Sequence, residues 1–339
     1  MQTASQVTAV RRHPAVRLYS RPGAAQNTGR DPRWSATSAN PFEHLDEGHS
    51  VKDFTVDNLT DEVIEAYTAH AQSPRLKQLF TALIRHLHAF ARDVELTEAE
   101  WFEAIMFLTA TGQKCNDQRQ EFILLSDTLG LSMLVDALNH PKGGAGTEST
   151  VLGPFFVDGA PAQPYGADLR RRELAAAEPC LVLGKVTDEQ GNPIAGATID
   201  VWQTAANGFY DVQDASAPQW NLRAQLSSNA RGEYAFVTEK PVSYPVPTDG
   251  PVGRMLAAAG RHGYRPAHVH FKIAAAGHEP LTTHVFVKGD TYLDSDAVFA
   301  TKDSLVGDFV DCTDAGEAAR FGLGTPYSRL QFDFGLMRR

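Results

Sequence analysis

Apolar positions recur at helical spacing from Asp57 to His140. The longest stripe consists of Leu76, Leu79, Phe80, Leu83, Leu87 and Phe90. Two further helices are predicted from Trp101, Ile105 and Leu108, and from Phe122, Leu125 and Leu129, with Gly130 as a break before Met133, Leu134 and Leu138. Ser73 with Pro74, and Thr97 with Glu100, are typical helix-start signals. Stripes of this strength must be buried, either against each other or against a second subunit.

The apolar period changes to two from Val151 onward, and turn residues become frequent. The segment 181–185 leads to a Gly191-Asn192-Pro193 turn and then to β-forming residues 198–202. A second hairpin is predicted through residues 232–237, and residues 330–336 alternate as in a half-buried strand. Many short strands indicate a β-sandwich or barrel. The predicted fold class is α+β: a helical region followed by an antiparallel β-sandwich.

Three segments follow from these changes in pattern. Residues 1–45 are Arg-rich, and Arg11, Arg12, Arg17, Arg21 and Arg30 all precede the first acid, Asp31. Such leaders can target organelles, but Pro14 and Pro22 interrupt any amphipathic helix, so we predict a disordered extension. Residues 46–145 form the predicted helical domain for dimerisation and linkage. Residues 146–339 form the predicted β-sandwich, which carries the candidate chemistry.

Composition narrows the class of protein. A formal net charge of −10 argues against a nucleic-acid partner, because phosphate binding needs a basic face. No apolar run approaches membrane-spanning length, so no membrane association is expected. Cys115, Cys180 and Cys312 are odd in number and widely spaced, without C-x-x-C. This usage predicts a reducing, cytoplasmic location and excludes a Cys-based zinc or disulfide framework.

The candidate chemistry centres on the run from Arg265 to Phe271, which reads as one β-strand. Because side chains alternate across a strand, His268 and His270 face one side, and Val269 and Phe271 face the other. Two neutral imidazoles on one face can form half of a metal site. The alternative interpretation is a pair of surface histidines with no ligand.

Two tyrosines change the balance between these interpretations. Tyr210 ends Asn207-Gly208-Phe209-Tyr210, and Tyr244 lies among prolines that fix its backbone. Taken alone, each tyrosine is a packing aromatic. Together with the His pair, two phenolate oxygens suit a trivalent ion such as Fe(III) better than zinc. A phenol ionises at neutral pH only beside a strong positive charge, which the ion supplies.

Several blocks, in order, resemble the intradiol ring-cleaving dioxygenases, and most closely the hydroxyquinol 1,2-dioxygenases. They are Gln113–Asp127 (QKCNDQRQEFILLSD), Leu152–Phe155 (LGPF), Asp200–Tyr210 (DVWQTAANGFY), Tyr244–Gly250 (YPVPTDG), Arg265–Phe271 (RPAHVHF) and Tyr292–Phe299 (YLDSDAVF). The resemblance covers about residues 55 to 310, and nothing transfers to the leader before about residue 50.

The resemblance implies a set of site residues. The iron ligands would be Tyr210, Tyr244, His268 and His270, with hydroxide as a fifth. Tyr244 would leave the iron and act as a base, and Arg265 would stabilise negative charge on the ring. The substrate-binding residues would be Leu124, Asp127, Gly153, Pro154, Val246, Pro247, His284 and Val298. The family also implies a homodimer through the helical region, with phospholipid along the dimer seam.

The implied activity is intradiol cleavage of an aromatic ortho-diol by O2 in aromatic catabolism, with hydroxyquinol as substrate and 3-hydroxy-cis,cis-muconate or maleylacetate as product. The alternative within the class is a catechol or chlorocatechol 1,2-dioxygenase; in those enzymes Gln usually stands where this chain has His284. A metal-free, transthyretin-like binding module is a second alternative, because residues 184–202 resemble its hairpin. It leaves the four ligands unexplained. A zinc hydrolase is disfavoured, because zinc sites rarely use tyrosine.

Overall fold

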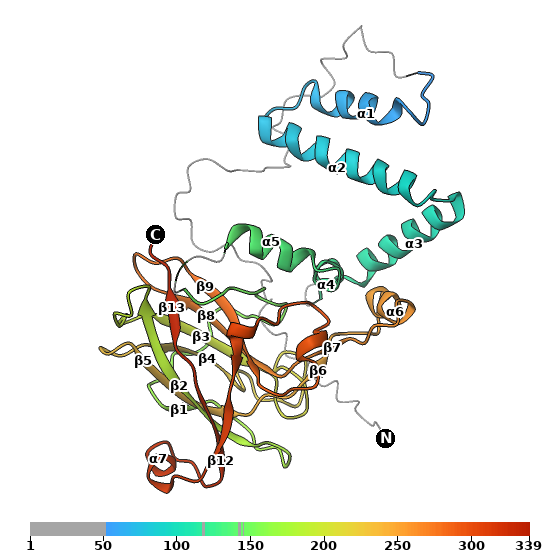
Figure 1. The fold of residues 1–339 in the computed structure, drawn as a ribbon. Helices are drawn as coiled ribbons and strands as arrows, with labels where there is room; N and C mark the ends of the chain where they lie inside the picture. Colours follow the sequence, from blue (N-terminus) through green and yellow to red (C-terminus); the bar gives the residue numbers. More distant parts are fainter. Residues whose placement is uncertain (1–51, 117–118, 142–143, 145) are drawn as a thin grey trace, which may run out of the picture. The chain divides into compact units, whose positions relative to one another are not determined.

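The computed structural model describes residues 52–116, 119–141, 144 and 146–339 (Figure 1). The predicted extension, residues 1–45, lies outside the described residues. Among the described residues, those before Thr109 belong to one compact unit and those from Thr109 onward belong to another. The domain limits at residues 45 and 145 stay predictions.

The unit before Thr109 is helical. It contains α1 (Leu59–Thr68), α2 (Pro74–Asp93) and most of α3 (Glu98–Lys114). The predicted start signals are confirmed, because the Ser73 side chain accepts a hydrogen bond from the Leu76 amide at 3.1 Å. Thr97 and Glu100 form the reciprocal bonds of a capping box. Helix α1 packs on α2 through Tyr67 and Phe80, whose ring centroids are 5.2 Å apart.

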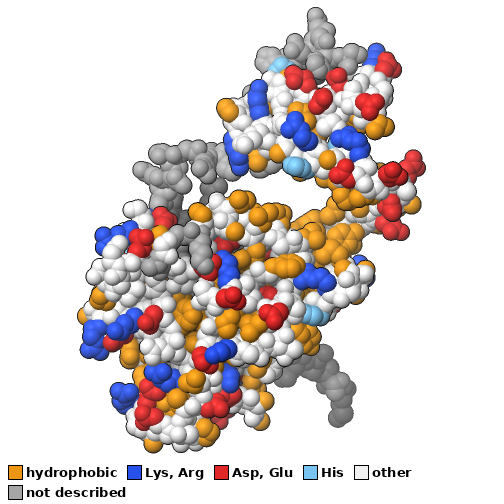
Figure 2. Space-filling view, in the orientation of Figure 1, with side chains coloured by type: hydrophobic (Ala, Val, Ile, Leu, Met, Phe, Trp, Pro, Cys, Tyr) orange, Lys and Arg blue, Asp and Glu red, His pale blue; other side chains and the backbone are white. Residues whose placement is uncertain are grey.

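The apolar stripe of α2 is only partly covered in the single chain. Leu83, Leu87 and Phe90 keep 51%, 58% and 55% of their surface exposed, and Trp101 on α3 keeps 53%. Within this unit, the stripes of α2 and α3 therefore bury only part of their apolar surface against each other. The prediction that remains is burial against a second subunit. Figure 2 shows apolar side chains on the surface of these helices.

The unit from Thr109 onward contains short helices and a β-sandwich. Its helices are α4 (Glu121–Thr128), α5 (Leu131–Asn139), α6 (Pro251–Ala258) and α7 (Ala315–Arg320), with 3-10 turns η1 (Leu293–Ser295) and η2 (Asp303–Leu305). Gly130 separates α4 from α5 as predicted, with a φ of 74° that favours glycine. Figure 1 shows α4 and α5 lying across one end of the sandwich.

Two sheets form the sandwich, with a small third ribbon. One sheet has the order β1-β5-β2-β12-β11, with β13 also paired to β2. Its strands are β1 (Ala167–Asp168), β2 (Pro179–Asp188), β5 (Glu233–Glu239), β11 (Phe309–Cys312), β12 (Tyr327–Gln331) and β13 (Phe334–Leu336). The other sheet has the order β10-β9-β8-β3-β4. Its strands are β3 (Thr198–Gln203), β4 (Arg223–Ser227), β8 (His268–Ala274), β9 (Leu281–Val287) and β10 (Val306–Gly307). The ribbon joins β6 (Tyr244–Pro245) to β7 (Tyr264–Arg265).

The pairing corrects two predictions. The sheets are mixed rather than antiparallel, because β1 with β5, β9 with β10, and β2 with both β12 and β13 run parallel. The strand predicted at 232–237 exists as β5, but it does not form a hairpin with β4, because β4 and β5 belong to different sheets. Hydrophobic period locates strands but does not choose their partners.

Strand β8 positions the candidate chemistry. Val269, Phe271 and Ile273 belong to the core between the two sheets, so His268 and His270 point to the opposite face, as predicted. Strand β9 lies beside β8 with His270 directly opposite His284. None of the described helices is both long and apolar enough to cross a membrane.

Candidate metal centre

The four predicted ligands converge at one end of β8. Tyr210 lies in the loop after β3, and Tyr244 begins β6, where it pairs with Arg265 of β7. The Tyr210 hydroxyl lies 3.1 Å from the Tyr244 hydroxyl and 2.8 Å from Nε2 of His270. Nε2 of His268 lies 3.2 Å from Nε2 of His270. All four side chains are buried.

These spacings fit donors around a single metal ion. Oxygen and imidazole ligands lie about 2.1 Å from a small cation, so neighbouring donors at right angles are about 3 Å apart. The three measured separations lie around this value. An uncharged hydrogen-bond network without a metal could also give such distances. It would bury four polar side chains, two phenols and two imidazoles, at a cost in free energy that no bound ion would offset. The donor set, two phenols and two imidazoles, suits iron.

The two imidazoles can bind a metal ion in their neutral form. Nδ1 of His268 lies 2.6 Å from the carbonyl oxygen of Pro266, and because that oxygen only accepts, Nδ1 carries the proton. Nε2 therefore directs its lone pair into the cluster. Burial lowers the pKa of both His268 and His270 well below the usual value, and nearby cationic groups lower it further. Burial raises the pKa of Tyr210 well above its usual value, and the neighbouring Tyr244 raises it further. Only a nearby cation would therefore ionise Tyr210.

His284 joins this cluster. The ligand nitrogens of His268, His270 and His284 all lie within 4.8 Å of one another, and all three residues are buried. Nδ1 of His284 is hydrogen-bonded to the Thr150 hydroxyl. Its Nε2 has no hydrogen-bond partner among the described residues. The structure thus brings the predicted substrate-binding His284 to the site through the β8–β9 register.

Aromatic packing fixes the donors. The Trp202 ring stacks on His270, with centroids 4.6 Å apart at an interplanar angle of 13°. Phe155 stacks on Tyr210 at 4.6 Å and 26°. A Cβ atom at Gly153 would lie 3.2 Å from Cε1 of His270, and Gly153 has a φ of 76°. Gly153 therefore lies beside His270, where the close approach of the backbone leaves little room for a side chain.

Arg265 is the positive charge of the site. Its NH1 lies 3.4 Å from Nε2 of His268, and its Nε donates to Asp296 at 3.2 Å. Asp296 also accepts from the amides of Val298 and Ala300, at 3.2 and 3.0 Å. Burial opposes the charge on Arg265, but the carboxylate of Asp296 outweighs it and the pKa is raised. Sequence reasoning missed Asp296, although it lies in the matched block 292–299.

The other predicted substrate-binding residues come from α4, from the loops that contain Gly153 and Tyr244, and from the loop after β9. Leu124, Val246 and Val298 belong to one apolar cluster, which joins α4, the Tyr244 loop and the loop after β9. Asp127, one helical turn after Leu124, is only 6% exposed. Burial raises the pKa of its carboxyl group, which lies within range of the charges of Arg265 and Asp296. Pro154 and Pro247 are half-buried and directly follow Gly153 and Val246.

A second buried ion pair supports Tyr210, and no pattern in the sequence pointed to it. Arg223 NH2 lies 2.6 Å from Oδ1 of Asp211, the residue after Tyr210, and both side chains are buried. Arg223 NH1 also donates to the carbonyl oxygen of Phe155 at 2.8 Å. One guanidinium therefore links the Tyr210 loop to the residue that stacks on Tyr210.

Known proteins match both parts of the chain. Residues 73–147 match the family described as "Catechol dioxygenase N terminus", and residues 151–337 match that described as "Dioxygenase". The chain is 51% identical to 6-chlorohydroxyquinol 1,2-dioxygenase of Cupriavidus pinatubonensis over 84% of this chain and 99% of that protein. The crystal structure of hydroxyquinol 1,2-dioxygenase from Pseudomonas putida is similar, with a TM-score of 0.79, 49% identity, and coverage of 84% of this chain and 99% of that one. Catechol 1,2-dioxygenase of Acinetobacter radioresistens gives 0.74 and 32%, over 84% and 94% of the two chains.

Proposed function

This chain belongs to the intradiol ring-cleavage dioxygenases, whose substrates are an aromatic diol and O2, and we propose that its diol is hydroxyquinol (1,2,4-trihydroxybenzene). The product would be 3-hydroxy-cis,cis-muconate or its keto form, maleylacetate. Family membership and the three-histidine cluster together indicate iron binding. They also leave no support for a metal-free binding module. The catechol enzyme reported above is a more distant relative than the two hydroxyquinol enzymes.

The observation that carries the choice of hydroxyquinol is the buried carboxyl group of Asp127. It lies on α4 beside an otherwise apolar wall that includes Leu124 and Val298. Ser132 is hydrogen-bonded to this carboxyl group, and the third hydroxyl of hydroxyquinol can donate a further bond, because a carboxylate accepts several. Catechol has no such hydroxyl, so it would leave this acceptor capacity unused. A role for Asp127 at the protein surface does not fit a side chain that is 6% exposed.

We propose Fe(III) as the oxidation state, with Tyr210, Tyr244, His268 and His270 as protein ligands. Two anionic phenolates favour the trivalent ion over the divalent one. When bound, the iron would withdraw electron density from the coordinated diol and make its ring reactive toward O2. A red-brown visible band from tyrosinate-to-iron charge transfer would identify this state.

The protein residues would supply binding, proton transfer and charge stabilisation. The Tyr244 hydroxyl oxygen would take a proton from a diol hydroxyl, because its β6 backbone holds it 3.1 Å from Tyr210. Arg265, held by Asp296, would stabilise negative charge that develops on the ring. Leu124, Val246 and Val298 would exclude water and support the ring face. Gly153 leaves room for the ring beside His270.

Hydroxyquinol is expected to be cleaved with a kcat/KM about 10- to 100-fold above that of catechol, because an additional hydrogen bond to a charged group contributes roughly 1.5–3 kcal/mol. Substituting Asp127→Ala should narrow this preference while leaving the iron content unchanged. Asp127→Asn keeps an acceptor oxygen and should retain part of the preference. Steady-state assays with both diols measure the ratio. Equal or better turnover of catechol by the unsubstituted protein would assign the chain to the catechol enzymes, and an unchanged ratio in Asp127→Ala would exclude a role for Asp127.

We further propose a homodimer formed through the exposed stripe of α2, with phospholipid along the same seam. Leu83, Leu87 and Phe90 are each about half-exposed on one face of the helix, and contiguous apolar surface that is functional often marks a protein interaction site. Light scattering should give twice the chain mass, and Leu87→Glu should give the monomer. Mass spectrometry of an organic extract tests for the lipid. A monomeric unsubstituted protein would contradict the interface. The cytoplasmic location predicted from the cysteines stays a prediction.

A further inference from the structure

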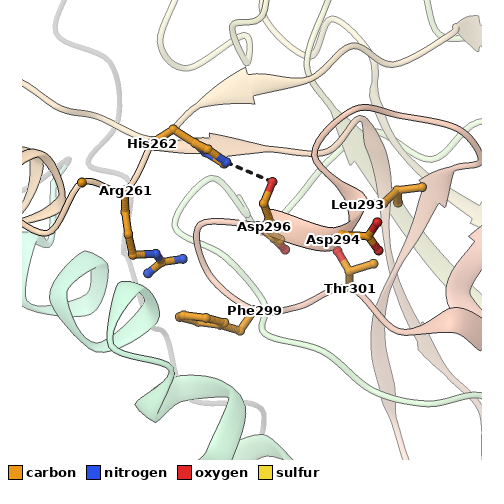
Figure 3. Close-up of a pocket in the computed structure, with 9 residues that line it drawn as sticks. Arg261, His262, Leu293, Asp294, Asp296, Phe299 and Thr301 are labelled. Atoms are coloured by element: carbon orange, nitrogen blue, oxygen red, sulfur yellow. Dashed lines mark hydrogen bonds between the residues drawn. The ribbon is translucent and has the colours of Figure 1, made fainter.

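A cavity of about 540 Å³ lies outside the cluster of metal donors (Figure 3). Two segments line it: residues 260–262, after α6, and the loop after β9, with residues 293–296, Phe299 and Thr301. One residue belongs to both sites. Asp296 lines the cavity, and its carboxylate holds Arg265, whose NH1 lies 3.4 Å from His268. The Asp296–Arg265 ion pair therefore connects the cavity to the metal donors.

The walls offer a flat, partly apolar surface. The guanidinium of Arg261 lies 4.4 Å from the centroid of the Phe299 ring, and its NH1 donates to the Thr128 carbonyl oxygen at 3.1 Å. A guanidinium is planar and can stack on both faces, and Phe299 covers one of them. Phe299 is half-exposed and has a φ of 60°, which is unusual for an aromatic residue. Backbone strain of this kind is often found at ligand sites.

The polar groups of the cavity differ in their access to solvent and in their partners. The Asp294 side chain is exposed, and the Thr301 hydroxyl is buried and unpartnered among the described residues. His262 is already bonded to Ser295 at 2.9 Å, and Asp296 to Arg265. The charges of Arg261 and Asp294 are of opposite sign. A dianion would be repelled by Asp294, whereas a neutral ring with several hydroxyl groups could donate hydrogen bonds to it.

We propose that this cavity is a second, outer binding site for a polyhydroxylated benzene, namely the diol substrate before it reaches the metal donors. The ring would stack on the free face of Arg261, and its hydroxyls would donate to Asp294. Asp296 would couple the two sites, because the carboxylate that forms a wall of the outer site also holds Arg265. The identity of the ligand rests on the proposed function; the cavity and its donors and acceptors do not.

The test is a titration of the iron-loaded protein with hydroxyquinol in the absence of O2, which prevents turnover. Calorimetry should count two molecules bound per chain, whereas the visible band should respond to only one of them. Asp294→Asn should weaken the outer site about tenfold through loss of a hydrogen bond to a charged group, and Arg261→Gln should weaken it about as much through loss of the stacking surface. The band shift, which reports the metal site, should remain in both variants.

Two substitutions away from the cavity serve as matched controls for Arg261→Gln and Asp294→Asn. Arg320 also lies over a phenylalanine, Phe321, at 5.9 Å, but not at the cavity, so Arg320→Gln should keep both sites. Asp308, paired with Lys288, is a surface acid elsewhere, and Asp308→Asn should do the same. A normal band shift with one molecule bound per chain would overturn the outer site. If cis,cis-muconate bound there and Asp294→Asn tightened it, the site would be one for dicarboxylates, and the proposal would be wrong. Absence of any band shift or turnover with hydroxyquinol would instead count against the proposed function.

Discussion

Replacing Tyr244 by Phe is expected to lower turnover by about 10²–10⁴-fold while much of the iron stays bound. The substitution removes one hydroxyl oxygen, which we assign as both the departing ligand and the proton acceptor. The backbone should be unaffected, because β6 is held by pairing with Arg265 and by the bond from the Val246 amide to the Gly263 carbonyl at 2.8 Å. Single-turnover rates and iron analysis by mass spectrometry measure the two effects separately.

Tyr210→Phe should behave in the opposite way. Tyr210 is fully buried, stacks on Phe155 and lies 2.8 Å from His270, so it is assigned as the ligand that stays bound. Its loss should reduce iron retention and the visible band more than the rate per bound iron. Tyr234→Phe is the matched control, because Tyr234 is an equally buried tyrosine whose hydroxyl donates to the Phe332 carbonyl. If the Tyr244 and Tyr210 variants lost iron and rate to the same extent, the distinct roles would be falsified.

Replacing Arg223 by Met is expected to lower the free energy of unfolding by about 3–5 kcal/mol and to release iron. The substitution leaves Asp211 buried without its 2.6 Å partner and frees the carbonyl oxygen of Phe155. Because Asp211 follows Tyr210 and Phe155 stacks on it, the loss of stability should be transmitted to that donor. Urea unfolding of the iron-free and iron-loaded protein measures the effect.

The control for this experiment is an exposed pair. Arg231, whose side chain is 78% exposed, is bonded to Glu233 at 2.8 Å, and Arg231→Met should lower the free energy of unfolding far less than Arg223→Met does. The combination of Arg223→Met with Asp211→Asn should recover part of the stability, because no charge is then left unpaired. Equal costs for Arg223→Met and Arg231→Met would show that the buried pair does not support the Tyr210 loop.

The local features of the site could be predicted because they depend on neighbours in the sequence. Alternation along 265–271 places both histidines on one face, and the structure has that arrangement. The helix starts at Ser73 and Thr97 are also local, and they hold. Each of these depends on residues no more than four positions apart.

The remaining features depend on contacts that no local pattern encodes. The partner of Arg265 is Asp296, across an intervening hairpin, and Arg223 reaches Phe155 from another strand. The error in pairing β5 with β4 has the same origin, because a turn at Gly232 fits both a hairpin and a crossing between sheets. Likewise, the helical stripes indicate that apolar area must be buried but not which surface buries it.

Strand β2 has a consequence for the synthesis of the protein. Cys180 pairs with Ser328, and Val186 pairs with Phe334, so the first long strand of the sandwich lies against its last strands. On the ribosome, β2 could pair with β5 early, but its other neighbours, β12 and β13, would emerge only after every metal donor from Tyr210 to His270 had been made. Long-range parallel pairing of this kind is slow to form. The nascent chain would therefore expose its donors to cellular metals before the sandwich that selects among those metals has closed.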